Sequence, residues 1–456
     1  MTDFTSQPRP AADTEPHAAR RAALACMIAL AIVLGVGRFA FTPLLPLMLS
    51  SGALDIRHGG WLASFNYAGY FVGAVTCAAL RVQPARMVHV GLVFTVLLTL
   101  AMGLTSAFWI WAPVRFVAGV VSAWTFVFAS QWGLRQLAEL HANEWGGVIY
   151  TGPGFGIVGT GLLVSAAGGY GAALGWLGFG AISAVLAACV WRVFVAPVAQ
   201  GQQERTTLAT AATAATAATA ATAATAATAA TAATAATAAT ATAPSHGRSA
   251  NASSAATPAA AREAPVTTHR PAHRADAFWL VVLYGIPGFG YIITATFLPV
   301  IARHALPAGS TWPDLFWPMF GAALIVGALG AARLPSHWDN RTLLAGSYVL
   351  QAIGIVLGIV WPTAGGFALG SVLIGLPFTA ITLFAMREAR RLHGDTAAGL
   401  MGYATAAYGL GQIVGPLVAA PVAAHTGSFS PALWLAAGAL LLGAVALVVV
   451  ALIRRR

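Results

Sequence analysis

The sequence predicts an all-α integral membrane protein whose twelve transmembrane helices form two pseudo-symmetric six-helix bundles. Three observations predict this fold class: the composition, the recurrence of long apolar runs, and motifs in the first half that return in the second. Of the 456 residues, 58% are hydrophobic and only 8% are charged, whereas soluble domains carry about a quarter charged residues. This composition excludes an ordinary cytosolic enzyme, a disordered regulator and a nucleic-acid-binding domain.

Six apolar runs precede a long polar segment, and six more follow it. A bilayer-spanning helix needs about 20 residues, and Gly and Pro inside such helices are tolerated where helices pack closely. The predicted helices lie near residues 22–49, 60–80, 87–106, 109–132, 146–168, 172–195, 277–301, 313–332, 343–361, 364–386, 397–421 and 430–453.

These runs divide the chain into four segments. A cytosolic tail (1–20) precedes the N-terminal six-helix bundle (21–199), and a linker (200–275) joins it to the C-terminal bundle (276–456). The linker repeats a Thr-Ala-Ala triplet ten times from Thr210 to Ala239 and has no apolar stripe to bury. We therefore expect a disordered low-complexity tether on the cytosolic side, with a recognition element as the alternative.

Arginine placement predicts the orientation. The net charge is +11, and all 24 basic residues are arginines. If the amino terminus is inside and the helices alternate, twenty arginines face inward, Arg57 and Arg303 face outward, and Arg38 and Arg115 lie within helices. Basic residues concentrate on the cytoplasmic side of membrane proteins, so both termini are predicted to be cytoplasmic.

An internal repeat relates the two bundles. At a constant offset of 253 residues, two glycines and a Leu-Pro pair of the first helix recur in the seventh: Gly35, Gly37, Leu45 and Pro46 match Gly288, Gly290, Leu298 and Pro299. Two parallel six-helix halves are typical of secondary transporters, whose substrate site lies near mid-membrane between the halves.

Several motifs resemble those of the major facilitator superfamily. Residues 115–123 resemble its Arg-x-x-x-Gly-x-x-x-Ala motif, and residues 150–156 resemble the Gly-Pro motif associated with exporters. More narrowly, residues 35–46, 62–70 and 408–416 resemble the YbfB/YjiJ branch of bacterial facilitator proteins. This resemblance implies the major facilitator fold in a bacterial plasma (inner) membrane. The sequence departs from the family in its basic loop motif, because residues 81–86 contain no acid and residues 339–341 match only in part.

The membrane helices contain two arginines and no mid-membrane acid. All thirteen carboxylates fall in tails, the linker, loops or helix ends. An ionised group at mid-membrane costs at least about 2.5–3.5 kcal/mol, so each arginine needs a reason. Arg38 either faces the central cavity and pairs with a substrate anion, or bonds carbonyls freed near Gly35 and Pro43 and holds a bent helix together.

The resemblance suggests roles for further residues. It implies that Arg115 acts in conformational exchange, with substrate contact as the alternative, and that Gln131, Tyr291 and Thr294 line the cavity beside Arg38. Gly152 and Pro153 of the Gly-Pro motif are expected at a helix contact. Interhelical hydrogen bonds are expected from the remaining polar residues of the membrane helices: Asn66, Tyr67, Tyr70, Tyr408 and Gln412.

Together these features predict a secondary active transporter that moves a small organic solute, preferably an anion, by alternating access. We expect no enzyme activity, cofactor, metal or nucleic-acid partner, since no nucleophile, acid–base pair or ligand cluster is visible. A coupling proton would have to use a His, a peripheral acid or the substrate's own carboxyl group. The alternatives are an exporter of neutral or lipophilic compounds and, from another class, a non-transporting membrane sensor or scaffold.

Overall fold

The computed structural model describes residues 15–77, 79–80, 82–194, 271–335, 337–393 and 397–455. Every regular element in these ranges is helical. The tail before residue 15 and the Thr-Ala-Ala tether lie outside the described residues.

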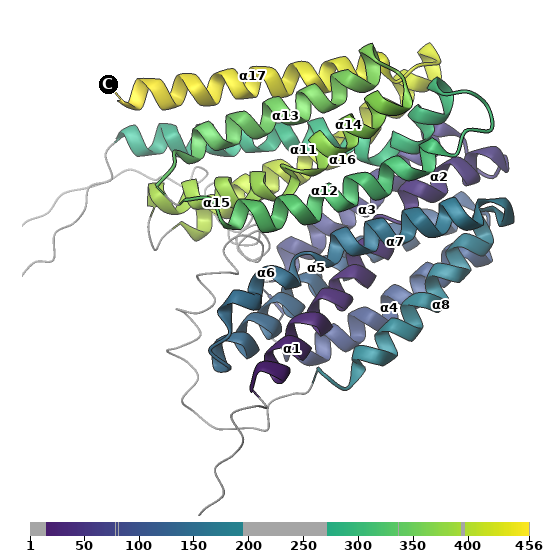
Figure 1. The fold of residues 1–456 in the computed structure, drawn as a ribbon, viewed down its shortest axis with the longest axis horizontal. Coiled ribbons are helices and arrows are strands. Elements are labelled where there is room, and N and C mark those ends of the chain that lie inside the picture. Colours follow the sequence, from purple (N-terminus) through teal and green to yellow (C-terminus); the bar gives the residue numbers. More distant parts are fainter. Residues whose placement is uncertain are drawn as a thin grey trace, which may run out of the picture.

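The N-terminal half comprises α1 to α8 and the C-terminal half comprises α11 to α17 (Figure 1). The helices of the N-terminal half are α1 (Glu15–Leu30), η1 (Ala31–Val36), α2 (Phe41–Ser50), α3 (Ile56–Cys77), α4 (Pro84–Leu104), α5 (Phe108–Glu139), η2 (Asn143–Trp145), α6 (Gly146–Ile149), α7 (Gly152–Ala167), η3 (Gly168–Tyr170) and α8 (Gly171–Trp191). Those of the C-terminal half are α11 (Pro271–Ala305), α12 (Trp312–Ala332), α13 (Asn340–Val360), α14 (Ala364–Gly375), α15 (Phe378–His393), α16 (Ala398–Thr426) and α17 (Ser430–Arg455).

The helices match the predicted number in each half. Eleven helical stretches of the described residues are long and apolar enough to cross a membrane. The twelfth, α3, has 22 residues but contains Asn66, Tyr67 and Tyr70, which make it less apolar. It packs tightly on α5, where Gly69 lies against the backbone of Phe116. The predicted fold class of two six-helix halves is confirmed.

The first membrane helix is interrupted, where the sequence predicts one continuous apolar run. The π-helix η1 follows α1 directly, and residues 37–40 form turns before α2 begins. Pro43 and Pro46 lie just beyond this interruption, and each lacks the N–H that would bond the preceding turn. π-Helical segments are frequent at functional sites. Arg38 lies in the turn directly after the π-helix η1.

The internal repeat is visible in the packing of the two halves. Gly35 of η1 lies against the backbone of Gly156 in α7, and Gly288 of α11 lies against the backbone of Tyr408 in α16. Gly288 and Tyr408 follow Gly35 and Gly156 by 253 and 252 residues. The same helix crossing therefore occurs once in each half, at positions where a glycine lets two backbones approach closely.

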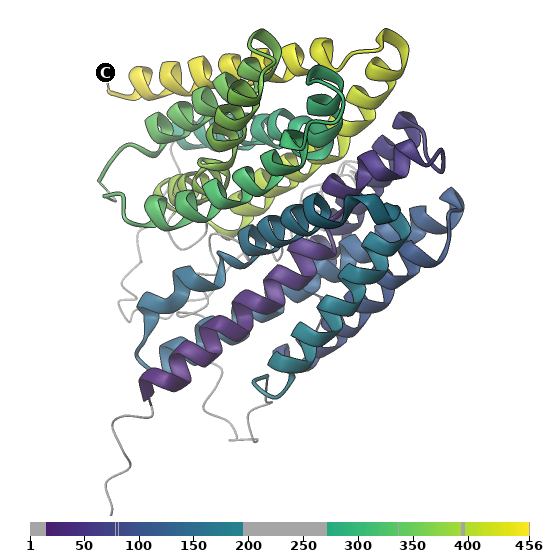
Figure 2. The same cartoon turned by 45° about the vertical axis from the view of Figure 1, so that its right-hand side comes forward.

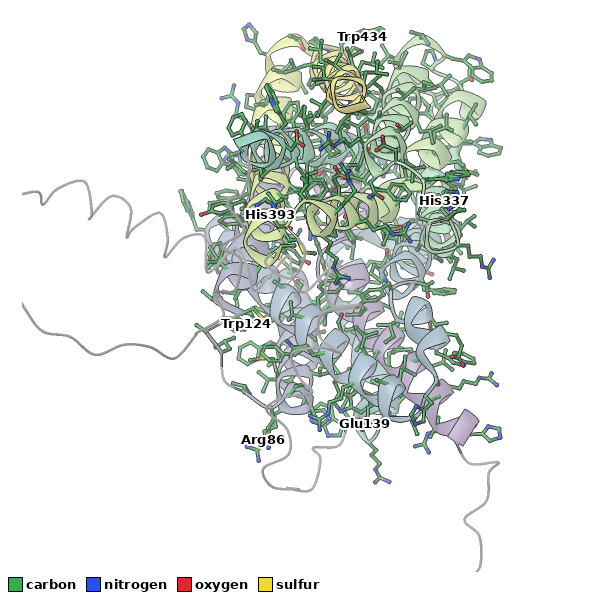
Figure 3. All side chains as sticks on the ribbon, turned by 90° about the vertical axis from the view of Figure 1, so that its left-hand side faces the viewer. Arg86, Trp124, Glu139, His337, His393 and Trp434 are labelled. Carbon is green, nitrogen blue, oxygen red and sulfur yellow. The ribbon has the colours of Figure 1, made fainter. Side chains whose placement is uncertain are left out.

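The two halves converge at one end and diverge at the other (Figures 1 and 2). We call the end that carries Glu15 and Arg455 the terminal end, and the end that carries Ser50 and Trp312 the opposite end. In Figure 2 the axes of the two bundles spread apart toward the terminal end. Figure 3 looks onto that end, where Arg86 and Glu139 of the N-terminal half lie well apart from His337 of the C-terminal half.

A buried ion-pair cluster joins helix ends of the C-terminal half at the terminal end. Arg341 of α13 contacts Asp276 of α11 at 3.0 Å and Glu388 of α15 at 2.7 Å. Arg391 also binds Glu388, at 2.6 Å. The partial loop motif that contains Arg341 thus retains charged partners from two other helices.

Candidate functional site

Arg38 lies between the two halves of the molecule and is buried. Its Nη2 donates a hydrogen bond to Oε1 of Gln412 in α16 at 3.0 Å. No carboxylate of the described residues forms an ion pair with it, and its Nε has no hydrogen-bond partner. Arg38 therefore keeps hydrogen-bond donors that the protein does not use.

Aromatic rings surround the Arg38 guanidinium. Its central carbon lies 4.3 Å from the ring centroid of Tyr70, 5.0 Å from that of Tyr67 and 5.2 Å from that of Phe39. A cation over an aromatic face gains about 0.5–2 kcal/mol, with the larger values in desolvated sites. These contacts compensate part of the cost of burying the charge without neutralising it.

Gln412 connects Arg38 to Tyr291. The Gln412 side-chain Nε2 donates to the Tyr291 hydroxyl while its Oε1 accepts from Arg38. Tyr291 of α11 follows Arg38 by 253 residues, so the two occupy equivalent positions in the internal repeat. One amide therefore links the same position of both halves.

Stacked tyrosines extend from this link. Tyr291 stacks on Tyr408 with ring centroids 6.0 Å apart, and Tyr408 stacks on Tyr284 at 5.0 Å. Phe378 of α15 meets the Tyr291 ring edge-on at 4.9 Å. We call Tyr67, Tyr70, Tyr284, Tyr291 and Tyr408 the tyrosine layer. Tyr70 and Tyr408 are partly exposed, so the layer is not sealed inside the protein.

Arg115 has a different environment. It is buried in α5, and its two terminal nitrogens donate to the carbonyl oxygens of Gly37 and Arg38 at 3.2 and 3.3 Å. Its guanidinium also lies over the Phe41 ring at 4.8 Å. These carbonyls belong to the interruption of the first membrane helix. Arg115 thus holds the broken helix together, which is the role that the sequence offers as an alternative for Arg38.

Hydrogen bonds between the halves surround the site. Thr42 donates to the carbonyl of Ala295 at 2.8 Å, and Ser64 donates to the carbonyl of Ile413 at 2.8 Å. Thr42 and Ala295 are also 253 residues apart, so they meet as equivalent residues of the repeat. The pseudo-twofold axis that relates the halves therefore passes close to Arg38.

A family model described as "Uncharacterised MFS-type transporter YbfB" matches residues 30–255 and 208–448 of the chain. These matches cover most of both halves. The chain belongs to this family of MFS-type transporters. It is not an enzyme but a multi-pass membrane transporter.

A solved structure supports the fold. The crystal structure of the nucleoside transporter NupG (D323A mutant) aligns with a TM-score of 0.62 and 13% sequence identity, covering 94% of this chain and 99% of that one. This similarity confirms the major facilitator fold of the transporter. Comparison with curated proteins finds no match.

The structure separates the other predicted site residues of the transporter. Asn66 donates to the backbone carbonyl of Arg115 at 2.9 Å, so it joins α3 to α5. Gly152 lies against the Met27 carbonyl, where α7 packs on α1, and Pro153 follows it. Gln131 is exposed on α5 and forms none of the contacts of the Arg38 cluster.

Thr294 also lies apart from the Arg38 cluster. It borders a small apolar pocket inside the C-terminal half, together with Ser371 of α14 and Leu433 of α17. Its hydroxyl has no hydrogen-bond partner. Of the four residues predicted to line the transport cavity, the structure therefore brings together Arg38 and Tyr291.

Sequence reasoning assigned Tyr67, Tyr70, Tyr408 and Gln412 to interhelical hydrogen bonds and did not single out Tyr284 or Phe378. The spacing of these residues along the sequence gives one signal that they belong together. Tyr67 and Tyr70 are three residues apart, and Tyr408 and Gln412 are four apart, so each pair shares a helix face. What the spacing does not show is that these two faces meet across the molecule at Arg38.

Proposed function

We propose that this transporter moves a small organic anion by alternating access, with Arg38 as the anion-binding residue. The observation that carries the proposal is a buried guanidinium between the two halves with unused donors and no carboxylate partner. A guanidinium binds a carboxylate through two parallel hydrogen bonds, which are about twice as strong as neutral ones.

The conformation supports a transport cycle in which the terminal end is open. Three hydrogen bonds between the halves lie between Arg38 and the opposite end: Thr42 to Ala295, Ser64 to Ile413, and Tyr67 with Thr296. The arginine bias supports a cytoplasmic terminal end, for a chain in the bacterial plasma (inner) membrane. In the described state the bundle axes then diverge on the cytoplasmic side and converge on the outer side (Figure 2).

The same site limits the ways in which a proton could be coupled to transport. Among the described residues, the central layer around Arg38 holds no carboxylate that could carry a proton through the membrane. A coupled proton would then travel on the substrate's own carboxyl group or on a peripheral His or acid. We expect transport of a weak acid to respond to the pH gradient through the protonation of the acid itself.

Uptake of radiolabelled organic anions into proteoliposomes tests the proposal. Arg38→Gln should lower anion uptake tenfold or more, because charge-assisted hydrogen bonds contribute about 1.5–3 kcal/mol each. Arg38→Lys should be intermediate, since it keeps the charge but loses the planar fork. The matched control is Arg333→Gln, an exposed arginine of the C-terminal half, which should transport at the parental rate. Equal uptake by Arg38→Gln and the parent would overturn the proposal.

One observation favours a second candidate, the export of neutral or lipophilic compounds. The tyrosine layer offers stacking surfaces and neutral hydrogen-bonding groups, and the Gly-Pro motif at Gly152 and Pro153 is associated with exporters. The structurally similar NupG is a nucleoside transporter, and a neutral planar solute of that kind would suit stacked rings. Uptake of neutral aromatic solutes that is insensitive to Arg38→Gln would support this candidate over the anion transporter.

A further inference from the structure

The Arg38 site already contains a group with the shape of its proposed ligand. A side-chain amide is planar and has the same three-atom outline as a carboxylate. The Gln412 amide places its oxygen on Nη2 of Arg38 at 3.0 Å and its nitrogen on the Tyr291 hydroxyl. A carboxylate in the same place would accept from both Arg38 and Tyr291, because both of these groups can donate.

The charge of the site matches one carboxylate. Arg115 uses both terminal nitrogens on backbone carbonyls, and the chain contains no lysine. The Nε of both arginines is unpartnered, but of the two only Arg38 donates to the Gln412 amide, so Arg38 is the cation that a carboxylate in the place of this amide would meet. A second ligand charge would be buried without a partner, which costs several kcal/mol.

The rest of the ligand would meet aromatic faces. Tyr70 lies over Arg38, and Tyr408 stacks on Tyr291 beside Gln412. Both rings are partly exposed, whereas Tyr284 and Tyr291, which stack with Tyr408, are buried. An aromatic ring in contact with the exposed parts of these rings, edge-on or offset, gains about 0.5–1.5 kcal/mol beyond its apolar area.

We propose that the substrate is an aromatic monocarboxylate whose carboxylate replaces the Gln412 amide on Arg38 and whose ring lies against Tyr70 and Tyr408. This inference rests on the proposed anion transport and specifies its substrate class. Gln412 acts as a tethered substitute that satisfies Arg38 while the site is empty. Binding transfers the Arg38 hydrogen bond from the protein to the substrate and releases one link between the halves.

A ligand panel with the purified full-length protein tests the substrate class. Benzoate is the probe, and the comparison ligands are cyclohexanecarboxylate, benzamide and terephthalate, with binding measured by calorimetry and by thermal shift. We expect benzoate to bind about two- to tenfold tighter than cyclohexanecarboxylate and more than tenfold tighter than benzamide. Terephthalate should bind more weakly than benzoate. Equal affinity for benzoate and cyclohexanecarboxylate, or preference for terephthalate, would overturn the inference.

Substitutions of Gln412 test whether its amide occupies the place of the substrate carboxylate on Arg38. Gln412→Glu supplies a permanent carboxylate to Arg38, so benzoate binding should fall more than tenfold while the melting temperature stays at or above the parental value. Gln412→Ala removes the competitor, and benzoate should bind at least as tightly as to the parent. Strong benzoate binding by Gln412→Glu, or its loss in a folded Gln412→Ala protein, contradicts the model.

Tyr408 variants separate this inference from the underlying function. Tyr408→Leu should abolish the preference for benzoate over cyclohexanecarboxylate, and Tyr408→Phe should keep it. If all carboxylates bind equally and Arg38→Gln removes them all, anion transport stands and the aromatic specificity fails. If no carboxylate binds or is transported, the proposed function itself fails.

Discussion

The two arginines of the membrane helices differ in what surrounds their guanidinium groups. Arg115 donates from both terminal nitrogens to the carbonyls of Gly37 and Arg38, whereas Arg38 donates to one neutral amide, that of Gln412; the Nε of each arginine has no hydrogen-bond partner. A buried charge without a partner lowers stability, and residues that do so persist where function requires them. Stability measurements can therefore separate the two roles.

We predict that Arg115→Gln and Arg38→Gln change stability in opposite directions. Arg115→Gln loses two charge-assisted hydrogen bonds to the interrupted helix, so it should be destabilised by about 3 kcal/mol or more. Arg38→Gln removes a buried charge that no carboxylate of the described residues pairs with, and it should match or exceed the parental melting temperature. Thermal unfolding in detergent provides the measurement. A loss of stability in Arg38→Gln as large as that in Arg115→Gln would show that Arg38 is structural.

At the scale of single residues, the composition and the internal repeat predicted part of the candidate site. Arg38 and Arg115 could be identified from the sequence, because they are the two charged residues inside otherwise apolar predicted helices. Assigning their roles needed three dimensions, since either arginine could reach the carbonyls freed by the broken helix. Thr294 illustrates the same gap: its helix was predicted, but the direction of its side chain depends on how α11 is rotated against α13 and α14.

At the scale of helices, the ends of α11, α13 and α15 are fastened by charge. Glu388 is almost fully buried, with 1% of its side chain exposed, and it binds both Arg341 and Arg391. Removing one partner of a buried ion pair leaves the other charge uncompensated, which costs about 3–5 kcal/mol. The helix ends of the C-terminal half are therefore held together by this ion-pair cluster, of which Arg341 of the partial loop motif is one member.

We predict that Glu388→Gln destabilises the transporter by about 3 kcal/mol, because Arg341 loses its closest carboxylate. Glu139→Gln is the control, since Glu139 forms an exposed pair with Arg135 in the N-terminal half, and exposed pairs contribute about 0–1 kcal/mol. Thermal unfolding of both variants decides the matter. Equal melting temperatures for the two variants would show that the buried cluster adds little.

The hydropathy of the sequence predicted where the membrane helices lie, but it did not predict where they are interrupted. The apolar run from residue 22 to 49 contains a π-helix and a turn, and the run from 364 to 386 divides into α14 and α15. Pro43 and Gly37 hint at the first break, yet such residues also occur in unbroken membrane helices. The break persists here because Arg115 of another helix satisfies the freed carbonyls, and that contact spans 77 and 78 residues of sequence.

For the whole molecule, a few contacts near the opposite end keep the halves closed there. They include the bonds of Thr42 to Ala295 and of Tyr67 to Thr296, the latter at 3.0 Å. Each neutral hydrogen bond contributes about 0.5–1.5 kcal/mol, so removing two of them shifts a two-state equilibrium by about fivefold to a hundredfold.

We predict that Thr42→Val combined with Tyr67→Phe shifts the transporter toward a state closed at the terminal end. Spin labels at Arg86 and His337, one in each half and both at the terminal end in Figure 3, report the change by pulsed dipolar spectroscopy. The double variant should gain a population with a shorter distance than the parent. Ser371→Ala, inside the C-terminal half, serves as the control. An unchanged distance distribution would show that these bonds do not control the equilibrium.

The pseudo-twofold axis near Arg38 has a consequence for charge. Any residue close to such an axis faces its own counterpart, and the counterpart of Arg38 is Tyr291. Two arginines there would repel each other in a medium of low dielectric constant unless a doubly charged solute lay between them. Tyrosine at the second position removes that repulsion and leaves a single positive charge. If Arg38 binds the solute as proposed, this difference between the two halves favours a solute with one negative charge, and we expect Tyr291→Arg to shift the preference toward solutes with two.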